Sequence, residues 1–447
     1  MSCTVFKSNN VVDQSINVFP PKNMKSVARI VRNYDSDTSG VFKFKSEHTA
    51  KFVAVGGVLS LEGGAPVTEI DLIAAGSGIT KDFTFTLDEG REYGYIGWSN
   101  NEVLIGDNLG SGAYPDYTLG LPSNEGQIWK IAHNSPLFNQ VVKMWDVSHI
   151  LYAGYVFDGA TKFNRDFATW NTSNFKLFTC FLRNAESFDQ SINHLDTSKC
   201  NNASSMMEGT KKFNRPVDQL DMSNCASFNR IFAYSGFNQP INWNMKSAVA
   251  ISEMFRGSNF NQPVDFGTMP NLMYAQDLFA ESNFNSPVKF SAPKLENARG
   301  WFYMCPKFNS TITVDFSPVK DMQFFLCGAI SFNQPISHFN IRNVLTFEGF
   351  ALNATAFDQD LSPFAAKYNV NADIAYVSVA PNWSTENYDK YLNAMWLDVG
   401  TTRQQAWANG TSPKVIKAIA KRSQASAAAV AGLIEAGWTI LDRGLVQ

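Results

Sequence analysis

The sequence predicts a mainly β protein. A repeat solenoid of about ten coils, each of 23–25 residues, is expected between an N-terminal β-sandwich-like domain and a C-terminal helical cap. Three observations lead to this prediction. Phenylalanine is unusually frequent, with 36 residues among 447. Phe-Asn or Phe-Asp dipeptides recur every 23 to 25 residues through the middle of the chain. Alternating apolar and polar runs occupy the N-terminal part, and an Ala-rich run lies near the C-terminus.

The composition argues against several classes of protein. Charged residues make up 17% of the chain and the net charge is −3, so we expect no binding to nucleic acid. No apolar run reaches the length of a membrane-spanning helix, and no secretory signal is visible, so we expect no membrane insertion. The six cysteines form no Cys-x-x-Cys pair and the five histidines are scattered. We therefore expect no metal and no cofactor.

The N-terminal segment, residues 1–118, is expected to form a β-rich attachment domain. Residues 41–45 and 83–87 alternate between apolar and polar side chains, as strands do. The Gly-Ser-Gly segment at 76–81 lacks the spacing of a phosphate-binding loop and is expected to be a hairpin turn. Residues 110–115 are expected to be the linker that leaves this domain.

The solenoid is expected to occupy residues 119–370. Its repeats are marked by Phe138, Phe163, Phe188, Phe213, Phe237, Phe260, Phe284, Phe308, Phe332 and Phe357. Four residues after each phenylalanine there is an apolar residue: Val142, Phe167, Ile192, Val217, Ile241, Val264, Val288, Ile312, Ile336 and Leu361. We predict that both rows point inward and that the second lies on a short strand. A single coil cannot bury such rows without neighbours.

Two polar features accompany these apolar rows. The residue after each repeat phenylalanine is Asn or Asp, which we expect to be a buried side chain that bonds the turns of neighbouring coils. An Asp/Asn-x-Ser turn follows the expected strand in the first copies, at 146–148, 171–173, 196–198 and 221–223. Its side chains can bond the backbone two residues further on. Copies six to eight are expected to lose this turn, which suggests a functional role for the variation there.

The repeat motifs point to a known family. Phe-Asn-Gln-Pro-Ile occurs at 237–241 and 332–336, Trp-Asp-x-Ser at 145–148 and Met-Phe at 254–255. Together they resemble the BspA-like leucine-rich repeats of bacterial and mycoplasmal surface proteins, which also occur in bacteriophage virion proteins. This resemblance implies a leucine-rich-repeat-like solenoid.

The resemblance continues into the C-terminal part, where residues 384–392 and 436–442 look like the capping segment of that family. We expect residues 371–447 to form an α/β cap over the last coil. Ser412-Pro413 predicts a helix start, and residues 424–436 predict a helix that ends before Gly437. Residues 438–441 then predict a last short strand.

The candidate binding surface consists of the outward positions five and six residues after the repeat phenylalanines. Its residues are Lys143, Asn193, His194, Asp218, Gln219, Asn242, Asp265, Lys289 and His338. His194 and His338 share a register, but lie too many coils apart to bind one metal. A mixed polar face of this kind suits the recognition of a glycan or a protein surface.

These observations predict a non-enzymatic recognition protein that binds a host cell-surface glycan or protein. We expect a phage virion component, such as a tail-fibre or head-decorating adhesin, held to other virion proteins through its N-terminal domain. The expected location is therefore the virion, with the bacterial cell surface or the extracellular space as the alternative. Whether the protein forms homo-oligomers stays open.

Three alternative functions remain at this stage: a bacterial cell-surface adhesin, a purely structural virion decoration and a polysaccharide depolymerase. The last rests on Asp196 and Asp221, which share a register and could form a stacked carboxylate pair about 5 Å apart. Capping of the Asp-x-Ser turn explains the same two residues without catalysis.

The cysteines leave a similar choice. Cys200 and Cys225 lie 25 residues apart in one register, so a disulfide between neighbouring coils is conceivable. Apolar residues fill the register in other coils: Ile150, Phe175, Val249 and Leu272. We therefore favour buried thiols at these positions.

Overall fold

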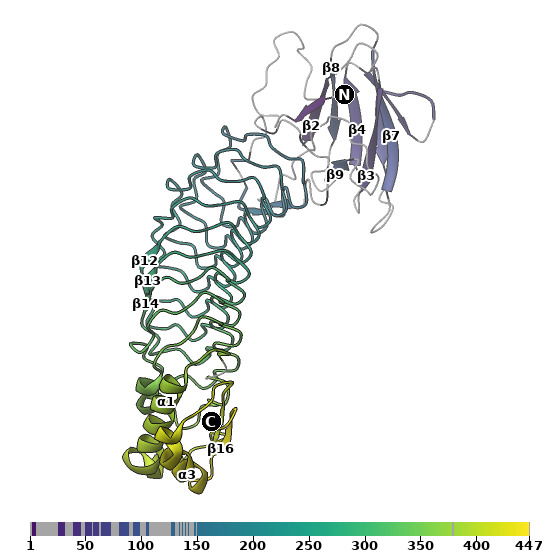
Figure 1. Ribbon diagram of the computed structural model, residues 1–447. Helices are drawn as coiled ribbons and strands as arrows, with labels where there is room; N and C mark the ends of the chain where they lie inside the picture. Colours follow the sequence, from purple (N-terminus) through teal and green to yellow (C-terminus); the bar gives the residue numbers. More distant parts are fainter. Residues whose placement is uncertain are drawn as a thin grey trace. The chain divides into compact units, whose positions relative to one another are not determined.

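The structure is a computed structural model of residues 1–447 (Figure 1). It describes residues 2–5, 26–31, 39–45, 50–55, 57–61, 64–72, 80–88, 93–98, 104–106, 127–129, 134, 136, 139, 142, 147–148, 150–377 and 380–446. The chain divides into two compact units, which are described separately below. The first comprises Met1–Asn202 and Gly209–Leu220, and the second comprises Ala203–Glu208 and Asp221–Gln447.

The N-terminal part of the first unit contains two antiparallel sheets. One has the strand order β1 (Ser2–Val5), β2 (Ser26–Val31), β8 (Tyr93–Trp98), β4 (Ala50–Val55) and β6 (Glu69–Leu72). The other has the order β5 (Gly57–Leu61), β7 (Thr80–Leu87), β3 (Ser39–Lys45) and β9 (Leu104–Gly106). The strands predicted at 41–45 and 83–87 are confirmed, and they pair with each other as β3 and β7. The linker expected at 110–115 and most of the hairpin turn expected at 76–81 lie outside the described residues.

Beyond these sheets the chain forms stacked coils (Figure 1). In the first unit, β10 (Gln127–Trp129) pairs in parallel with β11 (Tyr152–Gly154), and single parallel bridges continue from Tyr152 to Leu177 and Asn202. In the second unit the parallel bridges run through Ser227, Ala250, Tyr274, Asn297, Asp321, Thr346 and Asp373. We call these seven residues of the second unit the bridge row.

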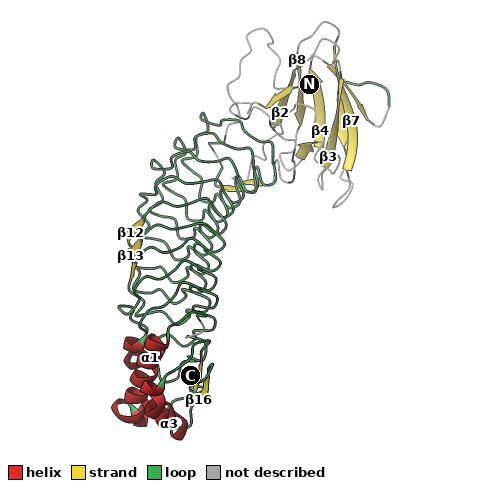
Figure 2. Cartoon of the chain, viewed as in Figure 1, coloured by secondary structure: helices red, strands yellow, loops and turns green. Residues whose placement is uncertain are grey.

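Regular strands at the position predicted from the repeat occur in three coils. They are β12 (Val264–Thr268), β13 (Val288–Ser291) and β14 (Ile312–Val314), which form a parallel sheet. In the other described coils the segment four residues after the phenylalanine is irregular or, after Leu361, begins a 3-10 helix, so the prediction of a strand in every coil is wrong (Figure 2). The parallel pairing that continues from coil to coil lies in the bridge row instead.

The interior of the coils is lined by the two predicted apolar rows. Nine of the ten repeat phenylalanines are described, and each is at most 1% exposed. All ten apolar residues four positions later are at most 6% exposed. The rings stack from coil to coil: Phe260 lies 3.9 Å from Phe255 and 6.2 Å from Phe284 between ring centroids. The inward orientation predicted for these rows is confirmed.

The Asn/Asp positions form a hydrogen-bonded ladder. At eight steps the side-chain oxygen of one residue accepts the backbone N–H of its counterpart one coil later: Asn139 to Asn164, Asn164 to Asp189, Asp189 to Asn214, Asn238 to Asn261, Asn261 to Asn285, Asn285 to Asn309, Asn309 to Asn333 and Asn333 to Asp358. The predicted bond to the neighbouring coil is therefore present. The expected burial is wrong, because these side chains are exposed or half-buried.

The Asx turns are also present. Asp196 and Asp221 accept the backbone N–H of the serine two residues later, each at 3.0 Å. The expectation that copies six to eight lose this turn is wrong for copy eight. There Asp315 accepts the backbone N–H of Ser317 at 2.8 Å.

Each coil also contains a pair of residues with positive φ, four positions apart. In several coils one member is glycine, as in Glu253 with Gly257 and Phe324 with Gly328. In two coils of the second unit neither member is Gly or Asn: Arg230 pairs with Tyr234, and Asp277 pairs with Glu281. We call this side of the coils the left-handed edge.

The C-terminal part contains η1 (Ser362–Lys367), α1 (Thr385–Leu397), η2 (Asp398–Thr402), α2 (Gln404–Asn409), β15 (Val415–Lys417), η3 (Gln424–Ser426), α3 (Ala427–Glu435) and β16 (Thr439–Leu441). The helical run predicted at 424–436 is confirmed as η3 and α3, and Gly437 follows at φ +85°. The predicted last strand is β16. Ser412-Pro413 does not start a helix, because residues 415–417 pair in parallel with β16.

Candidate functional site

Within each compact unit, neighbouring coils pair some of the predicted binding residues with each other. Asn193 donates to Asp218 at 2.9 Å, and Lys289 bonds Asp265 at 2.9 Å. The hydrogen bonds from Gln219 and Asn193 lower the pKa of Asp218, and that from Lys289 lowers the pKa of Asp265. These side chains therefore use part of their hydrogen-bonding capacity within the protein, and less of it is available to a ligand.

The other predicted binding residues are less uniform. Asn242 and Gln219 are exposed, whereas Lys143 lies outside the described residues. The Nε2 of His338 lies 3.0 Å from the backbone oxygen of Ile312, so one edge of its ring contacts the preceding coil. Burial lowers the pKa of His194, whose ring lies against that of Phe167. Neither histidine projects as a freely solvated side chain.

A second surface, which the repeat pattern did not reveal, lies along the bridge row. In the coils from 227 to 348, the residue after each bridge residue is fully buried: Phe228, Ile251, Ala275, Ala298, Met322 and Phe347. The residues on either side of it point outward, as alternation along an extended segment requires. These residues are Ser227, Asn229, Ala250, Ser252, Tyr274, Gln276, Asn297, Arg299, Asp321, Gln323, Thr346 and Glu348, and all of them except the buried Ser252 are exposed or half-buried. We call this surface the bridge face.

The bridge face is rich in hydroxyl and amide groups and has few charges. Some of its side chains hold each other in place: Asn229 accepts the backbone N–H of Ser252 at 2.8 Å, and Gln323 donates to Thr346 at 3.1 Å. At its centre, Tyr274 is 43% exposed. Such a surface offers both donors and acceptors around one aromatic ring.

Two buried side-chain oxygens, one in the coil of Tyr274 and one in the preceding coil, have no hydrogen-bond partner among the described residues. They are the Oγ of Ser252, a residue that is 5% exposed, and the Oε1 of Gln276. Buried polar groups are nearly always hydrogen-bonded, so these two oxygens need an explanation. Both oxygens are enclosed by the protein, so they do not contact a ligand on the surface directly.

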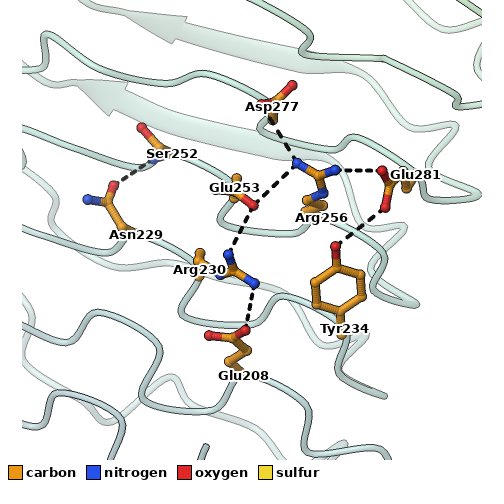
Figure 3. A network of polar contacts seen from close by, with 9 residues as sticks. All are labelled: Glu208, Asn229, Arg230, Tyr234, Ser252, Glu253, Arg256, Asp277 and Glu281. Carbon is orange, nitrogen blue, oxygen red and sulfur yellow. Dashed lines mark hydrogen bonds and ion pairs between the residues drawn. The ribbon is translucent and has the colours of Figure 1, made fainter.

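An ion-pair network borders the bridge face on the left-handed edge (Figure 3). Arg230 contacts Glu208 at 2.7 Å and Glu253 at 3.5 Å. Arg256 contacts Glu253 at 3.4 Å, Asp277 at 3.8 Å and Glu281 at 2.5 Å. Tyr234 donates to Glu281 at 3.4 Å. The network therefore links successive coils beside Asn229, Ser252 and Gln276.

Two groups of this network, Arg256 and Asp277, have shifted pKa values, and the causes of the two shifts differ. Although burial lowers it, the pKa of Arg256 is raised overall by its hydrogen bond to Glu281 and by the surrounding carboxylates. Burial raises the pKa of Asp277, and the attraction of Arg256 offsets this only in part. Two arginines face four carboxylates here, so negative charge is in excess within the network.

The network lies on strained backbone. Arg230, Tyr234, Glu253, Asp277 and Glu281 all have φ between 53° and 60°. For residues other than glycine this conformation is unfavourable by about 1–2 kcal/mol each. Strain of this kind persists only where the surroundings enforce it, and it is frequent at functional sites.

Asp196 and Asp221, the candidate carboxylates of the depolymerase alternative, accept hydrogen bonds that stabilise Asx turns. Asp196 accepts hydrogen bonds from both the backbone N–H and the hydroxyl of Ser198. The backbone N–H and hydroxyl of Ser223 lower the pKa of Asp221. The acid of a glycosidase needs a raised pKa instead. Asp196 belongs to the first compact unit and Asp221 to the second.

The cysteine register is buried, as expected for core positions. Cys200 and Cys225 are both 0% exposed, and the thiol of Cys225 donates to the backbone oxygen of Ser227. The equivalent residue in the next coil is Ala248 and not Val249, because Ala248 bonds Met245 just as Cys225 bonds Met222. The register assigned to Val249 is therefore wrong by one residue.

Among the described residues, no cluster of three or more His, Cys, Asp or Glu side chains could hold a metal ion. Within that same part of the chain, no helix is both long and apolar enough to cross a membrane.

The coils match one family of proteins. The family is described as Mycoplasma protein of unknown function, DUF285, and its model matches residues 127–219, 181–290, 215–314 and 275–381. Together these matches cover more than half of the 447 residues. The chain belongs to this family. No curated protein and no solved structure matches it. The family assignment covers the bridge face, and the N-terminal sheets lie outside it.

Proposed function

We propose that this chain is a non-enzymatic recognition protein. Its coils form a leucine-rich-repeat-like solenoid related to BspA-like repeats, and the bridge face binds a glycan or protein on a host cell surface. The observation that carries the proposal is the centre of the bridge face. There Tyr274 is 43% exposed, and the neighbouring coils contribute hydroxyl and amide side chains to the same face.

The chemistry of the bridge face favours a neutral ligand rich in hydroxyl groups. Amide and hydroxyl side chains can both donate and accept, as a sugar hydroxyl does. The charges on this face, Arg299, Asp321 and Glu348, have both signs, so neither a polyanion nor a polycation is favoured. A glycan is therefore the favoured ligand, and Tyr274 would pack against a sugar ring.

The proposal can be tested with a glycan array and with purified envelope polysaccharides as probes. We expect the full chain to bind a subset of glycans, and Tyr274→Ala to weaken that binding about tenfold, or about 1.4 kcal/mol. Tyr376→Ala is the matched control, because Tyr376 is also an exposed tyrosine, at 36%, and lies outside the bridge face. Equal binding by the Tyr274→Ala variant and the wild type would contradict the proposal.

We further propose the virion as the place of action, with the bacterial cell surface as the alternative. BspA-like repeats, which the chain resembles, occur in both settings. The family description names Mycoplasma proteins, so the alternative is tested on equal terms. Immunogold labelling of phage particles and of intact cells separates the two. Labelling of neither would contradict both locations.

A further inference from the structure

We propose that two copies of the chain pair with each other through the open side of strand β16, antiparallel and about a two-fold axis. β16 spans Thr439–Leu441 and lies in the C-terminal cap (Figure 1). We call its open side the β16 edge. This interaction surface is separate from the bridge face, and the inference does not depend on the glycan binding proposed for that face.

β16 is the outer strand of a parallel stack that starts in the bridge row. The row reaches Asp373, and the backbone oxygen of Ala375 then accepts the N–H of Lys417 in β15 at 2.9 Å. β15 in turn pairs in parallel with β16. In the part of the chain that the structure describes, β15 is the one strand that pairs with β16. One side of β16 is therefore left for another strand.

The backbone groups that face the β16 edge follow from the pairing on the other side. The bonds towards β15 and the residues after it use Thr439, Leu441 and Arg443. Along an extended strand, successive residues direct their N–H and C=O groups to opposite sides. The N–H and C=O groups of Ile440 and Asp442 therefore face the open side.

Such a row of backbone donors and acceptors complements the backbone of another extended segment. Native proteins commonly protect an edge strand with proline or with charged side chains. β16 has the sequence Thr-Ile-Leu, which contains neither. The β16 edge is thus suited to pairing with a strand of another chain.

An antiparallel pairing of two copies suits the side chains along the β16 edge. With the two-fold axis at Leu441, the backbone of Ile440 pairs with that of Asp442 in the second copy, and the two Leu441 side chains meet. Thr439 then lies opposite Arg443 of the second copy, so no like charges face each other directly. The sequence around Leu441 therefore complements itself.

The surroundings of the strand favour the same occupant. Leu441 is 50% exposed, and Ile434 and Leu445, before and after the strand, are 56% and 42% exposed. The carboxylate of Asp442 is paired with Arg422 of its own copy, so its charge is compensated before the copies meet. Contact between the two Leu441 side chains removes apolar surface from water in both copies at once.

Sedimentation velocity of the full chain at several concentrations tests the proposal. We expect a dimer that dissociates on dilution. Leu441→Lys places two ammonium groups at the two-fold axis and should weaken dimerisation about tenfold, or about 1.4 kcal/mol. Leu441→Glu should do the same, and an equimolar mixture of the two variants should restore the dimer. The matched control is Leu397→Lys, which changes another leucine, 62% exposed, at the end of α1.

Disulfide crosslinking tests the pairing register. Residues directly opposite each other at a non-hydrogen-bonded position of an antiparallel pair have Cα atoms about 4.5 Å apart. A disulfide spans Cα separations of about 4.4–6.8 Å. Leu441→Cys should therefore form a covalent dimer under mild oxidation, whereas Leu397→Cys should remain uncrosslinked.

Three results would overturn the proposal: a monomer at every concentration, a dimer that neither Leu441→Lys nor Leu441→Glu weakens, or a Leu441→Cys variant that stays uncrosslinked. Thermal unfolding by circular dichroism checks that each variant folds, which is expected because the Leu441 side chain is half exposed. The glycan assay with Tyr274→Ala is independent of these outcomes. Failure of the β16 edge and failure of the bridge face are therefore distinguishable.

Discussion

At the scale of single residues, the ion-pair network places several charged side chains on backbone with positive φ, a conformation that is unfavourable for residues other than glycine. Arg256 contacts three carboxylates, and Asp277 is the one whose pKa burial raises. A carboxyl with a raised folded-state pKa binds its proton more tightly in the folded than in the unfolded chain. The stability that this provides is present below the ordinary Asp pKa and is lost as the pH rises through the folded-state pKa.

Asp277→Asn should remove the loss of stability that ionisation of the Asp277 carboxyl causes as the pH rises. Asparagine resembles the protonated carboxyl, so we expect the variant to melt at or above the wild-type temperature at neutral pH. The difference should vanish below the ordinary Asp pKa. Thermal unfolding followed by circular dichroism at several pH values measures this. A variant that is less stable at neutral pH and equally stable in acid would mean that pairing with Arg256 outweighs burial.

Replacement of a single repeat phenylalanine should have a large effect on the free energy of unfolding. Phe260→Ala would remove a fully enclosed ring that stacks on Phe255 and Phe284. We expect a loss of about 3–5 kcal/mol in the free energy of unfolding, measured with denaturant. Tyr376→Ala, which truncates an exposed ring, is the control and should cost little. An unchanged midpoint for Phe260→Ala would refute the inward orientation.

At the scale of the coil, two features recur from coil to coil: the Asn ladder and the left-handed edge. The sequence revealed only the ladder. The Asn ladder was predictable because one residue type recurs at a fixed place after the phenylalanine. The left-handed edge was not predictable, because glycine marks only some of its positions. Where Arg230, Tyr234 or Glu281 occupies a positive-φ position, the residue type gives no sign of that conformation.

The ladder predicts a small, specific loss of stability. In Asn285→Ala the backbone N–H of Asn309 loses its acceptor, which lies 2.7 Å away. We expect a loss of about 1 kcal/mol in the free energy of unfolding, the usual net value of one hydrogen bond. Asn285→Asp keeps the acceptor, as Asp189 does naturally towards Asn214. Equal losses in the two variants would show that the ladder bond contributes nothing.

The left-handed edge predicts a contrast between two glycines. Gly257 and Gly267 both have positive φ, at +61° and +62°. A Cβ at 257 would lie 2.4 Å from the ring of Tyr234, whereas a Cβ at 267 would meet nothing within 4 Å. Both alanine variants carry backbone strain of about 1–2 kcal/mol. Only Gly257→Ala also brings its Cβ against another side chain, so it should lose more stability than Gly267→Ala. Denaturant titration of both variants compares them, and a smaller loss at 257 would argue against the packing of Tyr234.

At the scale of the whole molecule, the sequence predicted which rows are inside better than which face recognises a partner. The inward rows repeat one residue type, and burial selects for that repetition. The outward residues of the bridge face vary from coil to coil, so no periodic signal marks them. Alternation around Ala275 and Ala298 was the available clue, since each of these buried residues lies between two polar or exposed ones. The candidate row predicted instead pairs largely with itself.

Hydrogen–deuterium exchange of the full chain, with and without the glycan selected on the array, tests whether the bridge face binds that glycan. We expect slower exchange in peptides that contain residues 250–256 and 274–281, which carry the centre of the bridge face and the ion-pair network. Slower exchange confined to the row of Asn193, Asp218 and Lys289, or no change anywhere in the coils, would contradict it.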